Sequence, residues 1–470
     1  MWDLLLKGAT VVDPLNRLEG VYDVAIEGGK IAEVGKDLPA GSAKVVEDYT
    51  GKILQPGIID SHVHLGEIWG SPFGFKMLAM CGVTTCLDMA GPLDNILDTI
   101  PEAGAGVNIA ILEAARPKLT LSCDRPDAAE RQALIDRVLD QGAIGIKLMG
   151  GHFPMDLDIA ASFIDECYDR KAWVAWHCGN SVNGSNILGL RDSVEAAQGK
   201  FLHVAHVNSY CRAQVRDELS ESLEAIELLK ANPNLFAESY LSPLNGTRLT
   251  IENDEPISKV TVTCLKKVGC TPDYAGMEEA IRTGRAGVLR DNGVIGELLY
   301  GDEGVAYWKS QDTSTTGSFA VNPATSRFML AQAKRDDGSF VVDCFSTDGG
   351  TYPRNVIVEN GLLLVQFGAI TMKEFVVKAS LNGARALALP NKGHLAVGAD
   401  ADVSILDFER KKAYATIVDG KVIMKDGQLL GKGTGIVCDE RGEAYLTKRG
   451  IRAIVKGALD PQAIADRYIP

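Results

Sequence analysis

Short apolar runs alternate with longer amphipathic segments through the middle of the chain. Eight apolar runs recur, at residues 57–62, 83–89, 107–115, 143–150, 172–177, 201–207, 234–239 and 341–347. The segments between them, such as 127–142 and 220–233, place apolar residues at helical spacing. Alternation of buried strands with amphipathic helices is typical of βαβ units and a parallel sheet. Eight such units predict an α/β fold, a (β/α)8 TIM barrel, with the active site at the carboxyl ends of its strands.

The two ends of the chain share a different pattern. Residues 1–56 and 386–470 carry short apolar runs separated by glycine, Asp-Pro and Gly-Gly turns, which predicts one small β-sandwich formed by both ends. The barrel then spans residues 57–385, with a long insertion at about 240–340. An insertion of this length is either a lid or pocket wall at the active site or a surface for contact between subunits.

Chemically active side chains lie where the predicted barrel strands end. His62 and His64 are two residues apart, so in a strand they project from the same face. This pair alone is either half of a metal site or two histidines near a turn. Further polar residues end the fourth, fifth, sixth and eighth runs, namely Lys147, His177, His206 and Asp348. Each has a structural interpretation by itself, but together they predict a metal centre in the barrel mouth. His203, three residues before His206, is predicted to face away from the barrel interior.

Composition narrows the class of protein. The chain has 470 residues, 46% hydrophobic content and a formal net charge of −14, which is ordinary for a soluble enzyme and argues against nucleic-acid or anionic-membrane partners. Its ten cysteines lack paired spacing, so we expect reduced thiols and a cytoplasmic location. From the sequence we expect neither a signal peptide nor a membrane-spanning helix, because its apolar stretches are too short.

Several motifs resemble those of the amidohydrolase superfamily, in the cyclic amidohydrolase branch of hydantoinases, dihydropyrimidinases, allantoinases and dihydroorotases. The similarity covers nearly the whole chain. It includes the stretch from Gly29 through P-G-x-I-D-x-H-x-H, G-V-T-T at 82–85, G-x-K at 145–147, A-H-V-N-S at 205–209, N-P-A-T-S-R before the last strand and the closing G-x-D-A-D ending at Asp402. The H-x-H and the closing motif are the most specific of these.

This resemblance implies two divalent metal ions, best matched by zinc. His62, His64 and Asp348 would hold one ion, and His177 and His206 the second. Lys147 would carry a CO2-derived carbamate that bridges them. The ions would supply hydroxide for attack on an amide carbon, and Asp348 would carry the proton to the leaving nitrogen. The expected partner is a small-molecule substrate, and a homo-oligomer (dimer or tetramer) is expected.

Two departures bear on the substrate. Leu65 and Gly66 follow the H-x-H where dihydroorotases carry an arginine, and Asp348 is followed by glycine where related enzymes often have histidine. Loop position alone selects the candidate substrate contacts, which are His152, Asn180, Asn208, Tyr240, Asn245, Arg248, Arg327 and Arg354.

The leading hypothesis for the function is hydrolysis of a cyclic amide, imide or ureide. The alternatives are an N-acyl-D-amino-acid deacylase or isoaspartyl dipeptidase acting on an acyclic amide, and a non-catalytic scaffold, which the complete ligand set disfavours.

Overall fold

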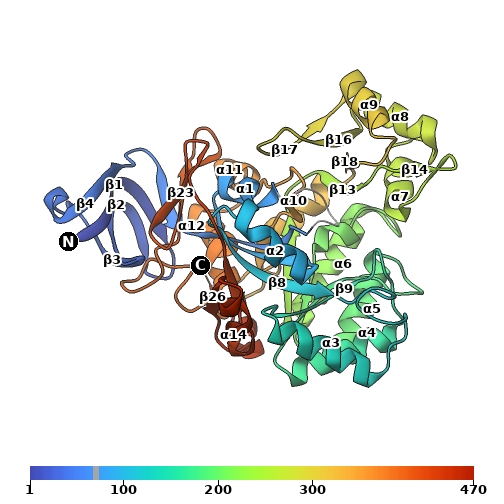
Figure 1. Ribbon diagram of the computed structural model, residues 1–470, viewed down its shortest axis with the longest axis horizontal. Helices are drawn as coiled ribbons and strands as arrows, with labels where there is room; N and C mark the ends of the chain where they lie inside the picture. The colour runs from blue at the N-terminus through green and yellow to red at the C-terminus, as the bar shows by residue number, and fades with distance from the viewer. Residues whose placement is uncertain (67–72, 470) are drawn as a thin grey trace.

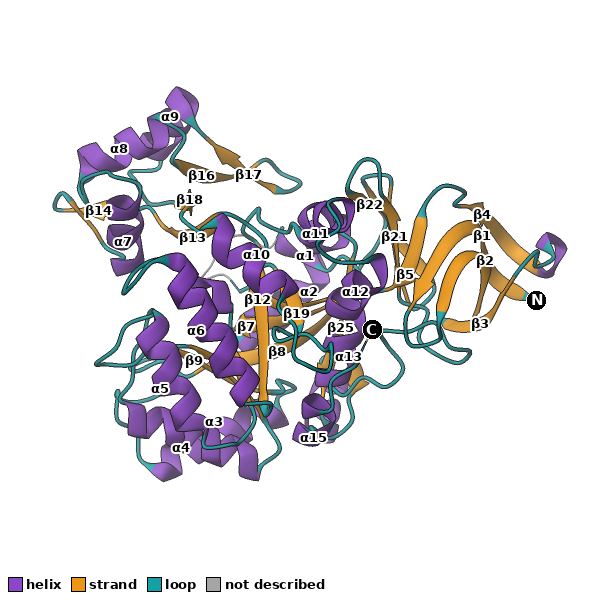
Figure 2. Ribbon diagram, turned by 180° about the vertical axis from the view of Figure 1, so that it is seen from behind, coloured by secondary structure: helices purple, strands orange, loops and turns teal. Residues whose placement is uncertain are grey.

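A computed structural model describes residues 1–66 and 73–469 of the chain. Parallel strands form its centre, in the order β19-β12-β11-β10-β9-β8-β7-β6-β20 (Figures 1 and 2). The strands are β6 (Ile58–His64), β7 (Val83–Ala90), β8 (Asn108–Ala114), β9 (Gly145–Met149), β10 (Trp173–His177), β11 (Leu202–Val204), β12 (Leu235–Tyr240), β19 (Cys344–Ser346) and β20 (Gly349–Gly350). They are buried almost throughout, as expected of parallel strands covered on both faces.

The barrel closes through a single segment of the chain. Residues Cys344–Ser346 pair with β12, and a few residues later Gly349–Gly350 pair with β6. A helix follows each of the eight main strands, namely α1 (Gly74–Met80), α2 (Leu93–Ala103), α3 (Ala128–Asp140), α4 (Leu157–Asp169), α5 (Ile187–Ala197), α6 (Glu218–Ala231), α10 (Ala324–Gln332) and α11 (Ile357–Gln366). The predicted α/β barrel is confirmed. A continuous helical stretch then follows, formed by α12 (Met372–Val376), the π-helical turn η4 (Val377–Leu381) and α13 (Asn382–Ala386).

Both ends of the chain build a second, mainly antiparallel sheet of nine strands, which confirms the predicted small β domain (Figure 2). Its strands are β1 (Trp2–Asp13), β2 (Leu18–Glu27), β3 (Lys30–Gly35), β4 (Ala43–Asp48), β5 (Ile53–Pro56), β21 (Val403–Asp407), β22 (Lys412–Val418), β23 (Lys421–Lys425) and β24 (Gln428–Leu429). A short turn, η1 (Ala40–Ser42), precedes β4. The two halves meet where β5 pairs with β21, and they share one apolar core that includes Leu6, Val24, Ile405 and Ile417.

The last part of the chain returns to the barrel. β25 (Gly435–Cys438) pairs in parallel with the first half of β8, while β9 pairs with the second half, and β26 (Arg452–Val455) extends this edge. Two helices, α14 (Glu440–Lys448) and α15 (Pro461–Ala465), accompany these strands. Residues 435–455, grouped with the terminal sheet in the sequence analysis, thus extend the barrel sheet.

The segment between β12 and α10 forms a small subdomain, labelled at the upper right of Figure 1. Its antiparallel sheet has the order β13-β18-β16-β17, and helices pack against it around Trp308 and Phe319. The elements are β13 (Leu244–Arg248), β14 (Ile251–Glu252), β15 (Glu255–Pro256), α7 (Lys259–Lys267), α8 (Tyr274–Arg282), β16 (Ala286–Asp291), β17 (Gly296–Leu299), α9 (Gly301–Ser310) and β18 (Thr316–Ala320). None of the helices in residues 1–66 and 73–469 is both long and apolar enough to cross a membrane.

Candidate active site

The six predicted ligands line one cavity of about 350 Å3 at the carboxyl ends of the barrel strands. They are His62, His64, Lys147, His177, His206 and Asp348. The insertion also forms part of the wall, through residues such as Asn245, Lys259 and Cys264. A cavity of this size falls within the range that proteins use for small ligands.

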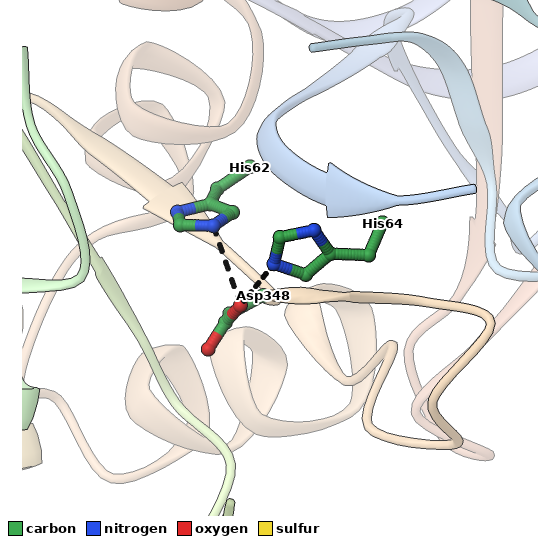
Figure 3. A group of neighbouring side chains, drawn as sticks. All are labelled: His62, His64 and Asp348. Carbon is green, nitrogen blue, oxygen red and sulfur yellow. Dashed lines mark hydrogen bonds and ion pairs between the residues drawn. The ribbon is translucent and has the colours of Figure 1, made fainter. Parts of the chain in front are cut away.

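Three of these residues converge closely enough to hold one metal ion. One ligand atom from each of His62, His64 and Asp348 lies within 4.8 Å of the others (Figure 3). Asp348 Oδ1 is 3.0 Å from His64 Nε2 and 3.3 Å from His62 Nε2. Tetrahedral zinc with bonds of about 2.0–2.1 Å would separate its nitrogen and oxygen ligands by roughly 3.3 Å. The spacing therefore fits a divalent ion.

The protonation of His62 supports the same conclusion. Its Nδ1 lies 2.6 Å from Glu238 Oε1, and this carboxylate holds the ring proton on Nδ1. The Nε2 atom, which is buried and has no hydrogen-bond partner in the described part of the chain, then presents a lone pair to Asp348. His62 Nε2 and Asp348 Oδ1 are both electron-rich and face each other. A cation between them would stabilise this arrangement.

His177 and His206 form a second pair. His206 Nε2 lies 3.1 Å from His177 Nδ1, and the ring of His206 stacks on that of His62 with centroids 5.0 Å apart. The second pair thus adjoins the first group. The other ring nitrogen of His177, Nε2, contacts the Ser185 hydroxyl at 2.7 Å.

The prediction that His203 faces outward was wrong. Its ring is fully buried, accepts a hydrogen bond from Trp173 Nε1 at 3.3 Å and approaches Glu238 at 3.7 Å. The alternation argument failed because β11 ends at Val204, and His206 adopts a left-handed backbone with φ of +35°. Asp348 is also left-handed, with φ of +48°. Uncommon backbone conformations at two candidate ligands are typical of functional sites.

Lys147 is buried in the barrel, and no acid within residues 1–66 and 73–469 lies at ion-pair distance from its amine. Its side chain is 1% exposed, and the hydrogen-bond contact described for Nζ is the Met89 sulfur at 3.5 Å. Burial lowers the pKa of this lysine to about 8, although the charges of Glu238 and Asp348 oppose the shift. At pH 7 about a tenth of the amine is therefore neutral and nucleophilic, far more than for an exposed lysine.

Burial also keeps three of the candidate histidines neutral. It lowers the pKa of His62 to about 4 and the pKa values of His177 and His206 well below the ordinary value. Burial alone would raise the pKa of Asp348, but the positive charge of Arg354 holds that pKa well below its usual range. Neutral imidazoles and an ionised carboxylate are the forms that bind metals.

Sequence reasoning assigned no role to the acids that support this site. Glu238 Oε1 accepts hydrogen bonds from His62 Nδ1 and from the backbone N–H of His206, both at 2.6 Å, and so connects the two groups. Asp60 accepts from the backbone of His62 and from Thr347, next to Asp348. A charged residue inside an otherwise apolar strand, as in L-F-A-E-S-Y, was the available signal, since a buried charge requires partners.

The candidate substrate contacts divide into two sets. Four line the cavity, namely His152, Asn180, Asn245 and Arg354. Of the others, Asn208 binds the strand end at Ser239 and Tyr240, Arg327 donates to the Leu241 carbonyl at 2.8 Å, and Arg248 is exposed. Tyr240 is buried behind the wall and contacts Arg212, a cavity residue that the sequence analysis missed.

Comparisons with known proteins agree with this architecture. The Amidohydrolase family matches residues 53–429. An allantoinase of Escherichia coli (strain SMS-3-5 / SECEC) is 35% identical over 158 residues, which cover 31% of this chain and 32% of the allantoinase. The match thus spans about a third of that relative's length.

Solved structures show the same fold. The dihydropyrimidinase of Brevibacillus agri has a TM-score of 0.62 at 16% identity, covering 98% of this chain and 100% of the other. The N-acyl-D-glutamate deacylase of Bordetella bronchiseptica, solved with zinc and a phosphonate inhibitor, has a TM-score of 0.65 at 14% identity, covering 92% of this chain and 98% of the other.

Proposed function

Because the chain belongs to the amidohydrolase family, as its motifs predicted, we propose that it is a metal-dependent hydrolase that opens the C–N bond of a cyclic amide, imide or ureide. The observation that carries this proposal is the convergence of His62, His64 and Asp348 beside the His177–His206 pair. The partial match to allantoinase supports a cyclic ureide as the substrate class.

The donor set fits two divalent ions, for which zinc is the best match to imidazole and carboxylate ligands. His62, His64 and Asp348 would hold one ion, His177 and His206 the other, and a carbamate on Lys147 would bridge them. In forming the carbamate, the neutral Lys147 amine bonds to the carbon of CO2 and releases one proton to solvent. When bound, the ions lower the pKa of water and polarise a carbonyl oxygen.

The residues around Asp348 keep it ionised and fix its position beside the proposed metal ligands. Its Oδ1 lies beside both histidines of β6, while Arg354 Nη2 holds Oδ2 at 2.8 Å. The Arg354 guanidinium lies 5.3 Å from the ring centroids of both Tyr240 and Tyr352, which fixes its position. Asp348 would accept a proton from the attacking water and deliver it to the departing nitrogen.

An acyclic amide is the second candidate substrate. Asn245, Lys259 and Cys264 of the insertion line the cavity together with the barrel residues, so a longer substrate would contact both parts of the chain. This would suit an N-acyl-D-amino-acid deacylase.

A substrate panel tests the proposal. We would measure metal content and then hydrolysis of allantoin, hydantoins, dihydropyrimidines and N-acetyl-D-amino acids. We expect two metal ions per chain and turnover of at least one cyclic compound. Turnover confined to the acetylated amino acids would favour the second candidate, and a fully metallated protein inert on the whole panel would contradict both.

Replacing Glu238 with glutamine should weaken metal binding. Glutamine is similar in size, but it is a weaker acceptor for the ring proton of His62 and for the backbone N–H of His206. We expect a loss of roughly 10–100-fold in metal affinity, the usual effect of removing such a supporting contact. Competition with a chelator measures the affinity directly.

Glu166→Gln is the matched control for this substitution. Glu166 is also a buried glutamate, but it pairs with Arg131 at 2.7 Å outside the site. Equal metal affinities in the two variants would show that Glu238 does not position the ligands.

A further inference from the structure

Arg212 lines the cavity and forms no ion pair with any residue that the structure describes. We propose that the substrate carries a carboxylate separate from the scissile amide, and that Arg212 binds it. This inference rests on the proposed function and narrows its substrate class to acidic amides or ureides.

The arginine is held firmly in the wall. It follows the turn η3 (Val207–Tyr210) and lines the cavity. Nε donates to Asn322 Oδ1 at 2.7 Å, and Nη2 donates to three oxygens, those of Tyr240 (2.6 Å), Asn245 (2.9 Å) and Ser209 (3.0 Å). These acceptors come from the barrel and from the insertion, so the guanidinium is fixed before a ligand arrives. Such preorganisation reduces the entropy cost of binding.

None of these four acceptors carries a charge. Within the described ranges, Arg212 forms no ion pair, and its Nη1 makes no hydrogen bond. Arg354, the other arginine of the wall, is instead paired with Asp348 at 2.8 Å. These neutral oxygens therefore orient the Arg212 side chain without neutralising its charge. One edge of the planar guanidinium stays available to bind an anion.

The balance of charge in the cavity points the same way. The chain carries a net charge of −14, yet the only acid among the described residues that line the cavity is Asp348, against Lys147, Arg212, Lys259 and Arg354. Lys147 and Asp348 belong to the proposed metal centre, and Arg354 is paired. Arg212 and Lys259 remain as cations that no acid of the described wall neutralises, and they would attract an anionic substrate.

Tyr240 lies between Arg212 and the proposed metal site. Its hydroxyl contacts Arg212, and its ring centroid is 6.4 Å from that of His206. One tyrosine side chain thus separates the guanidinium from a proposed metal ligand. A carboxylate bound there would lie several bonds from the amide that is cleaved.

Paired ring substrates test this inference. We would compare hydantoin-5-acetic acid with hydantoin-5-acetamide, which has nearly the same shape without the charge, using both enantiomers of each. In the wild type, kcat/KM should favour the acid by roughly 10–100-fold, the usual value of a charge-assisted hydrogen-bonded pair. Arg212→Gln should bring the acid-to-amide ratio close to one, and Arg212→Lys should retain part of it. The ratio does not depend on the fraction of folded enzyme.

Arg285→Gln is the control, because Arg285 lies in the same insertion, contacts Glu279 and Cys270, and does not line the cavity. It should keep the wild-type acid-to-amide ratio of kcat/KM.

Calorimetric binding of both compounds to metal-free protein separates this inference from the proposed function. An acid preference in binding that Arg212→Gln removes would support the inference even if no hydrolysis occurs, a result that contradicts only the proposed function. Equal binding of acid and amide by the wild type, or a preference unchanged in Arg212→Gln, would overturn the inference.

Discussion

Replacing Lys147 with alanine is expected to reduce kcat/KM by on the order of 10³-fold or more and to release metal. A bridging carbamate would be the one ligand shared by both ions, so its loss weakens both sites together. Metal catalysis contributes several kcal/mol to transition-state stabilisation, and about 1.4 kcal/mol corresponds to a factor of ten. The variant should still fold, since the substitution also removes a desolvated amine. Metal per chain, thermal unfolding and turnover are the measurements.

Short carboxylates provide a second test of the same residue. Acetate, propionate or bicarbonate can occupy the space left by the lysine and supply the missing oxygens, so we expect partial recovery of metal binding and activity in Lys147→Ala. Full activity in the variant without any additive would exclude the bridging role.

Lys378→Met is the matched control. Lys378 is also fully buried, and burial lowers its pKa to about 7, but its Nζ donates to the Val342 carbonyl at 2.6 Å and lies over the rings of Phe340 and Phe345. This lysine is satisfied by its surroundings, so its loss should change stability while leaving the activity of the folded enzyme nearly intact.

The barrel could be predicted from the sequence because its strands are buried on both faces. Continuous apolar runs separated by amphipathic helices reflect that burial directly. The candidate ligands followed from the same reasoning, because residues at the carboxyl ends of the barrel strands lie together at one end of the barrel, regardless of the loop conformations. The error at His203 shows the limit, because alternation holds only while the strand continues, and β11 ends two residues before His206.

The rest of the site depends on contacts between distant parts of the chain. Glu238 connects residues of β6 and the loop after β11, and Arg212 is positioned by acceptors as far along the chain as Asn322. No local pattern specifies such pairings. The buried acids could still have been anticipated individually, because Asp60, Asp88 and Glu238 each interrupt an apolar strand and therefore need a partner.

Asp348→Asn is expected to leave metal largely bound while lowering kcat by roughly 10²–10⁴-fold, the usual contribution of a general acid or base. The asparagine carbonyl can take the place of Oδ1 beside His62 and His64, which continue to bind the ion. The amide cannot accept a proton from water at neutral pH. Metal content and kcat should thus respond differently here, whereas in Lys147→Ala they should fall together.

The control for Asp348 is Asp343→Asn on the same segment. Asp343 is buried to a similar degree, but it pairs with Arg467 at 2.6 Å and accepts from the backbone N–H of Ala237, away from the cavity. Its loss should lower thermal stability with little change in kcat. Wild-type turnover in Asp348→Asn would exclude the proton-transfer role, and complete loss of metal in that variant would show that the carboxylate is needed chiefly as a ligand.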